Sequence, residues 1–268
     1  MDYKLMALDI DGTLVSSNHQ LLPETQHALI EAQTQGLKLV LASGRPTPGM
    51  MKLAEALELE KFGGFVLSYN GGRITNMQTK EVIHEVFLTP EEAHEIYDFA
   101  KENNVNMMAY DEADIITEDD DDYIQIESTI NAMPLKRTDD FKKAVVNKTI
   151  KVLTTGSPEI IVEVEKAYIE KFEDRFSICR SMPFFLEVMP QGINKAASLG
   201  KLLATLDLTP DEMIACGDGF NDIEMVKYAG LGVAMENAVD EVKAVANYVT
   251  KSNDDDGIAH VIKKFVLK

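Results

Sequence analysis

An apolar run near the start of the chain ends in two aspartates, and this feature constrains the fold most. Residues 5–8 and Ile10 read as a buried strand, with Asp9 and Asp11 two positions apart at its end. Because side chains alternate along a strand, both carboxylates would point the same way. Ionised carboxylates at the end of a buried strand need a cation or hydrogen-bond donors. The pair indicates a metal site, an acid/base pair or both; the alternative is a capped turn, since Asp11-Gly12 is also a common turn dipeptide.

Strands and helices alternate in the rest of the N-terminal segment and again in the C-terminal third. Further buried strands are expected at about residues 37–42, 64–68, 213–218 and 231–235. Helices are expected at about residues 24–35, from 47, 194–206, from 220, 240–246 and from 257. Continuous apolar strands separated by helices are typical of a parallel sheet covered on both faces. We therefore predict an α/β fold, a Rossmann-like doubly wound parallel sheet.

The pattern changes between about Val82 and Pro190. Paired strand-like runs appear there, with helices expected at about residues 90–103 and 158–172. Antiparallel pairs with segregated helices predict an α+β unit. The sequence therefore predicts a core formed by residues 1–81 and 191–268, with an α+β cap formed by residues 82–190 inserted into it.

Charge limits the expected partners. The chain carries 45 acidic and 26 basic residues, a net charge of −19, without a local basic patch. Such a surface repels nucleic acid and anionic membranes, and no apolar run approaches the ~18 residues of a membrane span, so we expect neither partner. An anionic substrate would need positive charge from a metal, a few Lys or Arg side chains, or helix N-termini. The two cysteines, Cys179 and Cys216, read as reduced thiols, which predicts a cytoplasmic protein.

More polar residues follow predicted strands or open predicted helices. Ser43-Gly44-Arg45 comes after the second strand and before a helix, where a hydroxyl, amides and the helix dipole favour a phosphate oxygen. Lys195 opens the helix after the insertion, and residues 217–222 (G-D-G-F-N-D) end another buried strand with two more carboxylates. Each alone has an ordinary interpretation as a turn, a solvated helix residue or a loop. Because open α/β sheets bind ligands beyond the carboxyl ends of their strands, together they predict one site.

In this order the motifs resemble those of the haloacid dehalogenase superfamily of phosphatases. The segment D-I-D-G-T-L looks like its first motif, Ser43 its second, Lys195 its third and G-D-G-F-N-D its fourth. The segments S-Y-N-G-G and G-I-N-K, and the tail V-T-K-S-N-D-D-D-G-I-A, are similar to the Cof-type branch, closest to its YidA-like sugar phosphatases. The resemblance implies a cap of the C2B type that governs substrate specificity.

The resemblance also implies roles for individual residues. Asp9 would be the nucleophile that forms an aspartyl-phosphate, and Asp11 the general acid and base. Mg²⁺ would be held by Asp9, the backbone carbonyl of Asp11 and Asp218. The phosphoryl group would be bound by Ile10, Ser43, Gly44, Lys195 and Asn221. Asp222 would support the site indirectly, through a water or by orienting Lys195. Arg45 would either steer the phosphate or anchor its loop.

We therefore expect a Mg²⁺-dependent phosphoric monoester hydrolase acting on a small phosphorylated metabolite, with sugar phosphates as the expected class. One alternative is a phosphomutase that uses the same aspartyl-phosphate chemistry. Another is a non-catalytic regulator that binds a phosphorylated metabolite, although Asp9 and Asp11 are both intact. The expected assembly is a monomer or a homodimer.

Overall fold

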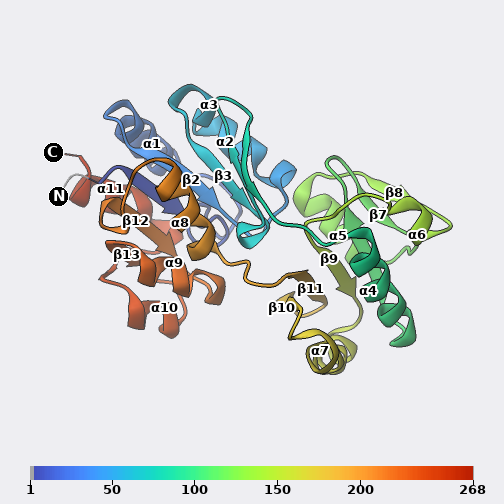
Figure 1. Ribbon diagram of the computed structural model, residues 1–268. Coiled ribbons are helices and arrows are strands. Elements are labelled where there is room, and N and C mark those ends of the chain that lie inside the picture. The colour runs from blue at the N-terminus through green and yellow to red at the C-terminus, as the bar shows by residue number, and fades with distance from the viewer. Residues whose placement is uncertain (1–2, 268) are drawn as a thin grey trace. The chain divides into compact units, whose positions relative to one another are not determined.

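The computed structural model describes residues 3–267, which form two compact units (Figure 1). One unit, the core, comprises the chain up to His84 together with the chain from Asn194 onward. The other unit, the cap, comprises Glu85–Ile193. The predicted boundaries, after residues 81 and 190, each stand three residues before these divisions.

An eight-stranded sheet forms the centre of the core, in the order β14-β13-β12-β1-β2-β3-β4-β5. Its strands are β1 (Leu5–Leu8), β2 (Lys38–Ala42), β3 (Phe65–Ser68), β4 (Arg73–Asn76), β5 (Val82–Glu85), β12 (Met213–Gly217), β13 (Leu231–Ala234) and β14 (Tyr248–Val249). All pairs from β14 to β3 are parallel, and β4 is antiparallel to β3. Apart from β14, the parallel strands are almost wholly buried, which confirms the predicted α/β fold.

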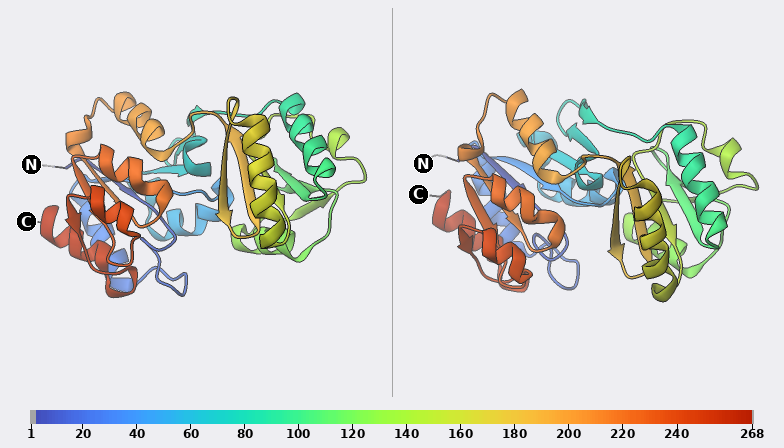
Figure 2. Two further views of the ribbon diagram at one scale, coloured as in Figure 1. Left: turned by 90° about the horizontal axis from the view of Figure 1, so that it is seen from below. Right: turned by 60° about the horizontal axis from the view of Figure 1, so that its bottom comes forward.

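Helices cover both faces of this sheet (Figure 2). They are α1 (Pro23–Thr34), α2 (Met51–Ala56), α3 (Leu59–Phe62), α8 (Lys195–Thr205), α9 (Ile223–Tyr228), α10 (Asp240–Val245) and α11 (Gly257–Phe265). Short 3₁₀ turns are η1 (Thr47–Met50), η2 (Tyr69–Gly71), η3 (Pro210–Glu212), η4 (Phe220–Asp222) and η5 (Asn253–Asp255). The segment from Thr209, which has the signals of a helix start, forms only the turn η3.

Strands at both edges of the core sheet differ from the expectation, and at one edge β14 was not anticipated. β4 and β5 were not anticipated, and Val82, predicted to open the cap, lies in β5 of the core sheet. Both strands are short, and most of their residues are only partly buried, so they lack the apolar run that marks the central strands. The purely parallel sheet expected from the sequence therefore ends in an antiparallel edge.

The cap contains a six-stranded sheet in the order β10-β11-β9-β6-β7-β8. Its strands are β6 (Asn106–Tyr110), β7 (Ile115–Thr117), β8 (Leu135–Arg137), β9 (Val152–Thr155), β10 (Phe176–Met182) and β11 (Phe185–Pro190). Its helices are α4 (Pro90–Glu102), α5 (Asp122–Asn131), α6 (Phe141–Ala144) and α7 (Pro158–Phe172). All pairs are antiparallel except β7 with β8. The expected α+β organisation is present, although β8, β9, α5 and α6 were not anticipated.

One face of the cap sheet packs against α4 and α7, and their apolar side chains form a separate core. α4 begins at a complete capping box, in which Thr89 Oγ1 accepts from the amide of Glu92 and the Glu92 carboxylate accepts from the amide of Thr89. No helix in residues 3–267 is long and apolar enough to span a membrane.

Candidate active site

The site begins where two neighbouring strands of the core sheet end. β1 and β12 are parallel, with Leu8 opposite Cys216. Asp9 follows β1, and Asp218 follows β12. The amide of Asp9 donates to the carbonyl of Cys216 at 3.0 Å, so the two strands stay paired up to the first aspartate. Parallel pairing thus brings together two aspartates that are far apart in the sequence.

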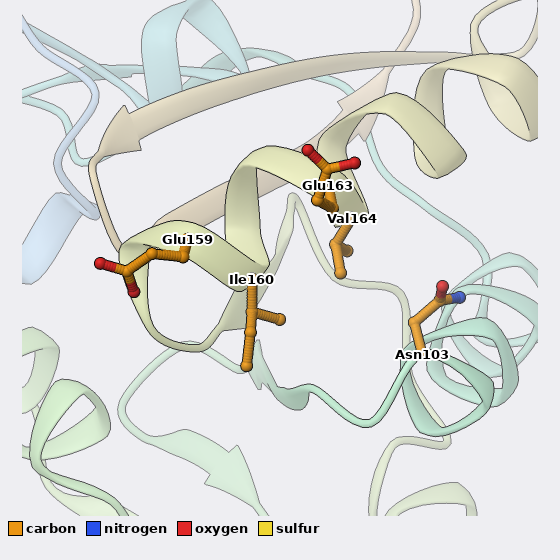
Figure 3. A pocket seen from close by; sticks show the side chains of 5 residues that line it. All are labelled: Asn103, Glu159, Ile160, Glu163 and Val164. Carbon is orange, nitrogen blue, oxygen red and sulfur yellow. The ribbon is translucent and has the colours of Figure 1, made fainter.

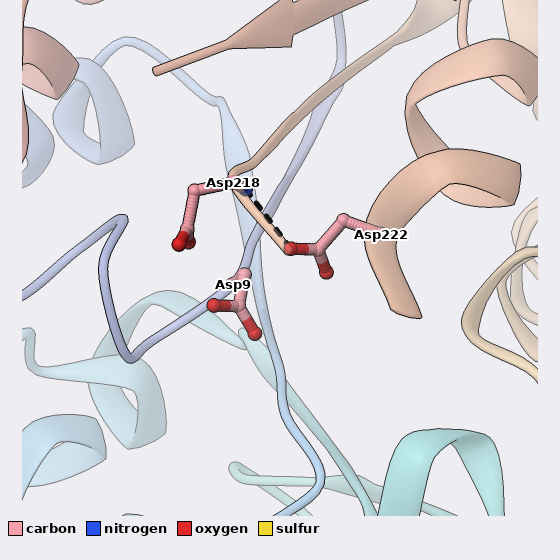
Figure 4. A group of neighbouring side chains, drawn as sticks. All are labelled: Asp9, Asp218 and Asp222. Atoms are coloured by element: carbon pink, nitrogen blue, oxygen red, sulfur yellow. Dashed lines mark hydrogen bonds between the residues drawn. The ribbon is translucent and has the colours of Figure 1, made fainter. Parts of the chain in front are cut away.

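Three carboxylates converge at this edge (Figure 4). Asp9, Asp218 and Asp222 each offer one oxygen, and these oxygens lie within 4.8 Å of one another. Asp9 is 6% exposed and Asp222 is wholly buried. A buried group of like charges on this scale requires compensating positive charge.

Lys195 supplies part of that charge. It is the first residue of α8, whose N-cap Asn194 accepts a hydrogen bond from the amide of Ala197. The buried Nζ of Lys195 lies 2.6 Å from Oδ1 of Asp9 and 2.6 Å from Oδ1 of Asp222. Burial alone lowers the pKa of Lys195, but the two carboxylates outweigh it and hold the pKa above its usual range. The lysine is therefore a fixed cation.

One lysine does not balance three carboxylates. Burial, followed by the neighbouring charge of Asp222, raises the pKa of Asp9 well above its ordinary value, although Lys195 opposes the shift. Burial also raises the pKa of Asp218 to about 6, while a hydrogen bond from Thr13 opposes it. A divalent cation would relieve both penalties, and an all-oxygen donor set suits Mg²⁺. The residues present therefore fit the predicted metal.

Asp222 has a different environment from the other two carboxylates. Its Oδ1 accepts from Lys195, and its Oδ2 accepts from the amides of Asp218 and Gly219, each at 3.0 Å. Because both oxygens are engaged, Asp222 orients Lys195 and fixes the loop that carries Asp218. The sequence predicts a supporting role for Asp222, and that role stays a prediction.

Asp11 lies outside the carboxylate group. Its side chain is 46% exposed, and both of its oxygens pair with the guanidinium of Arg45. The exposed His19 lies on the same side, with Nδ1 3.5 Å from Oδ1 of Asp11. The two aspartates of D-I-D therefore do not share one environment, contrary to the simple expectation for alternating strand residues. The strand β1 ends at Leu8, so the alternation stops before Asp11.

The predicted phosphate-binding residues surround the same edge. Ser43 is buried, and its Oγ accepts from the amide of Arg45 at 3.2 Å, next to Gly44. Ile10 is buried, and its carbonyl accepts from amides of the following turn. Asn221 is exposed, and its Nδ2 donates to Oδ1 of Asn70 at 3.0 Å.

Three residues that hydrogen-bond to the site were not predicted from the sequence. Thr13 Oγ1 donates to Oδ1 of Asp218 at 2.6 Å, and Asn237 Nδ2 donates to the carbonyl of Gly12 at 2.8 Å. Asn70 contacts Asn221 as described above. Thr13 and Asn70 belong to segments that resemble family motifs, so a signal existed for them. Asn237 carries no such signal.

Gly12 shows how tightly this turn is built. Its φ of +82° is a conformation that favours glycine, and a Cβ at this position would lie 2.2 Å from Oδ2 of Asp218. A larger residue would displace the carboxylate, so the Asp-Gly pair is part of the site and not only a turn.

Surface cavities occur in the cap, and none of these residues lines them. One of about 370 Å³ lies beside α7 and the end of α4, lined by Asn103, Glu159, Ile160, Glu163 and Val164 (Figure 3). Its charged residues are both acidic, which does not suit a phosphate. A second, of about 500 Å³, includes Arg180, but Nε of this arginine is paired with Glu165 at 2.8 Å.

Comparison with known proteins decides the family. The sequence family of haloacid dehalogenase-like hydrolases matches residues 6–262. The chain belongs to this family. A haloacid dehalogenase-like hydrolase from Bacteroides thetaiotaomicron is 43% identical, with a TM-score of 0.94 over 98% of this chain and 99% of that one. The superfamily and the α/β fold expected from the motifs are thereby confirmed.

Relatives with more specific names are also similar. The 5-amino-6-(5-phospho-D-ribitylamino)uracil phosphatase YcsE of Bacillus subtilis (strain 168) is 32% identical over 100% of this chain and 97% of its own length. The solved structure of the haloacid dehalogenase subclass IIB sugar phosphatase BT4131 is 29% identical, with a TM-score of 0.83 over 99% of this chain and 100% of that one. The chain is therefore a member of a family of phosphatases and phosphotransferases.

Proposed function

We propose that this protein hydrolyses small phosphate monoesters, with sugar phosphates as its substrate class, through an aspartyl-phosphate on Asp9 and with Mg²⁺ as cofactor. The observation that carries the proposal is that buried Asp9 and Lys195 and partly buried Asp218 meet at the carboxyl ends of β1 and β12. It supplies a positioned nucleophile, a fixed cation and an oxygen donor set in one place.

In the first half of the reaction, a carboxylate oxygen of Asp9 attacks phosphorus in line with the ester oxygen. The new bond is the aspartyl-phosphate, and the bond that breaks is that between phosphorus and the leaving oxygen, which takes a proton from Asp11. In the second half, Asp11 accepts a proton from water as the water oxygen attacks phosphorus. Inorganic phosphate leaves, and the carboxylate of Asp9 is regenerated.

The remaining residues bind and orient the phosphoryl group. Ser43, the amide of Gly44, Lys195 and Asn221 would contact its oxygens, where charge develops in the transition state. Asp9, Asp218 and the backbone carbonyl of Asp11 would hold Mg²⁺, which stabilises negative charge on the phosphoryl oxygens when bound. Lys195 is held in its position by Asp222, so its charge is oriented before substrate arrives.

Two relatives support the substrate class. The name of YcsE describes a phosphorylated ribityl chain, and BT4131 is described as a sugar phosphatase. Both descriptions share a phosphate on a polyhydroxylated carbon chain. We attribute the choice among such substrates to the cap, Glu85–Ile193, which has its own hydrophobic core and contains none of the residues proposed for the chemistry.

The compartment and assembly are part of the same proposal. Cys179 and Cys216 are both free thiols, which supports the reducing cytoplasm as the location of the enzyme. We expect a monomer or homodimer.

The proposal is tested by measuring phosphate release from a library of phosphorylated metabolites with Mg²⁺ present. We expect steady release from several sugar and polyol phosphates by the wild-type protein. The same preparation of an Asp9→Asn variant controls for contaminating phosphatases. Conversion of one sugar phosphate to another without phosphate release would show a phosphomutase instead, and absence of both reactions would contradict the proposal.

A further inference from the structure

The turn η2, after β3, has a strained backbone at the edge of the proposed site. Tyr69 and Asn70 have φ angles of 54° and 55°, and Gly71 follows with a φ of 108°. Two successive non-glycine residues in the left-handed region are energetically unfavourable. Such strain persists only where the surrounding contacts fix the conformation, and it is concentrated at functional sites.

Backbone contacts explain how the turn is held. The amide of Asn70 donates to the carbonyl of Ser43 at 2.9 Å, and the amide of Tyr69 donates to the carbonyl of Arg45 at 3.0 Å. On the other side, the carbonyl of Gly71 accepts from Ser198 Oγ at 2.7 Å. Ser198 lies on α8, three positions after Lys195. The turn therefore joins the Ser43 loop to the helix that carries the lysine.

The side chain of Asn70 lies between two residues proposed to bind phosphate. Its Oδ1 accepts from Asn221 Nδ2 at 3.0 Å. A Cβ built on Gly44 would lie 3.1 Å from Nδ2 of Asn70, so the side-chain amide is packed against this glycine. Nδ2 donates no hydrogen bond to any residue in 3–267. The strained turn thus presents a hydrogen-bond donor beside Gly44.

We propose that Asn70 is a phosphate-binding residue. Its Oδ1 fixes the amide group of Asn221, and its Nδ2 donates to a phosphoryl oxygen alongside the amide of Gly44. This inference rests on the proposed function, because it assumes that the phosphoryl group is bound at Gly44 and Asn221. It explains why an asparagine occupies a strained position: a residue with one acceptor and two donors serves both neighbours at once.

The test uses an Asn70→Gly variant, because glycine adopts the left-handed conformation without strain and the change removes only the side chain. The matched control is Asn104→Gly, an exposed asparagine with a φ of 54° in the cap. We measure the affinity for inorganic phosphate by calorimetry with Mg²⁺ present, together with kcat/KM and thermal unfolding. A hydrogen bond to a charged group corresponds to a loss of about 10- to 100-fold, expected for both affinity and kcat/KM in Asn70→Gly alone.

A second variant separates the donor from the rest of the side chain. Asn70→Asp keeps the shape and an acceptor for Asn221 but replaces Nδ2 with a charged oxygen, so it should bind phosphate more weakly than Asn70→Gly. A folded Asn70→Gly protein with phosphate affinity and kcat/KM within about twofold of wild type would overturn the inference. A wild-type protein that binds no phosphate would overturn it as well. If phosphate binding depends on Asn70 but no monoester is hydrolysed, the inference holds and the proposed function fails.

Discussion

The guanidinium of Arg45 binds both carboxylate oxygens of Asp11, with Nε donating to Oδ2 at 2.8 Å and Nη2 to Oδ1 at 2.5 Å. Its Nη1 donates to the carbonyl of Gly49 at 3.3 Å. One side chain thereby connects the proposed acid/base to the turn η1. Of the two roles left open by the sequence, these contacts favour anchoring over steering of the phosphate.

Arg45→Lys should lower kcat by about tenfold, because an ammonium cannot form the two parallel hydrogen bonds that orient Asp11. Arg45→Gln should lower it further, up to about 100-fold, the lower end of what general acid/base catalysis contributes. KM for a small generic phosphate ester should change by less than threefold. Steady-state kinetics on both variants check this. A large rise in KM with unchanged kcat would instead support direct binding of the phosphate.

Asp9→Asn should reduce turnover by roughly 10⁴-fold or more, because the amide cannot attack phosphorus. The fold should survive, since the amide fills nearly the same volume and the buried charge of the carboxylate is removed. Phosphate release gives the rate, and thermal unfolding gives the control. Activity within tenfold of wild type, in a preparation free of other phosphatases, would refute the assignment of Asp9 as the nucleophile.

The sequence predicted that Asp9 and Asp218 share one site, because ligands bind beyond the carboxyl ends of parallel strands and the family resemblance implies that both aspartates hold the metal. The adjacency of their strands, β1 and β12, is seen only in the structure. Lys195 was predicted from its place at a helix start. The hydrogen-bond partners of individual side chains could not be predicted in this way. Asn70 and Asn221 are separated by 151 positions, and no periodicity relates them.

The missed edge strands β4 and β5 have a common cause. β4 reads R-I-T-N and β5 reads V-I-H-E, so neither contains an apolar run or a clear alternation that would mark it as a strand. Their position is determined by pairing along the sheet edge, which is a tertiary effect. The separation of Asp11 from the carboxylate group has a similar origin, since the ion pair with Arg45 depends on a loop far along the chain.

Removal of divalent metal with EDTA should abolish phosphate release, and Mg²⁺ should restore it. Ca²⁺ should not, because its larger and more flexible coordination would disturb the in-line geometry while occupying the same oxygens. Asp218→Asn should raise the Mg²⁺ concentration needed for half-maximal activity by at least about tenfold. Full activity after exhaustive chelation would contradict the metal requirement.

The metal-free protein should lose stability as the pH rises from about 4 to about 6. Burial raises the pKa of Asp218 to about 6 in the folded state, from an ordinary value of 3.8, so the unfolded chain releases this proton first and ionisation favours unfolding in this window. The effect is at most about 3 kcal/mol. Urea denaturation in EDTA, compared between wild type and Asp218→Asn, isolates it. Identical pH dependence in the two proteins would show that Asp218 is not perturbed.

A buried ion pair in the cap supports a prediction about stability. Lys151 Nζ donates to Oε1 of Glu187 at 2.8 Å, and their side chains are 2% and 4% exposed. Oε2 of Glu187 has no hydrogen-bond partner among residues 3–267. The pair therefore carries a desolvation cost that the ionic hydrogen bond between Lys151 and Glu187 offsets only in part.

Lys151→Met should destabilise the protein by about 3–5 kcal/mol, because it leaves the Glu187 carboxylate buried without its cation. Lys151→Met combined with Glu187→Leu should recover most of that loss, since two apolar side chains need no partners and lie among other buried residues of the cap sheet. The free energy of unfolding in urea, measured for both single variants and the double variant, gives the coupling between the two positions. If the double variant lost as much stability as the sum of the two single variants, the two side chains would be energetically independent despite their contact. A large coupling energy together with a stable double variant is the expected result. It would show that the two side chains depend on each other, while the ion pair as a whole contributes little net stability.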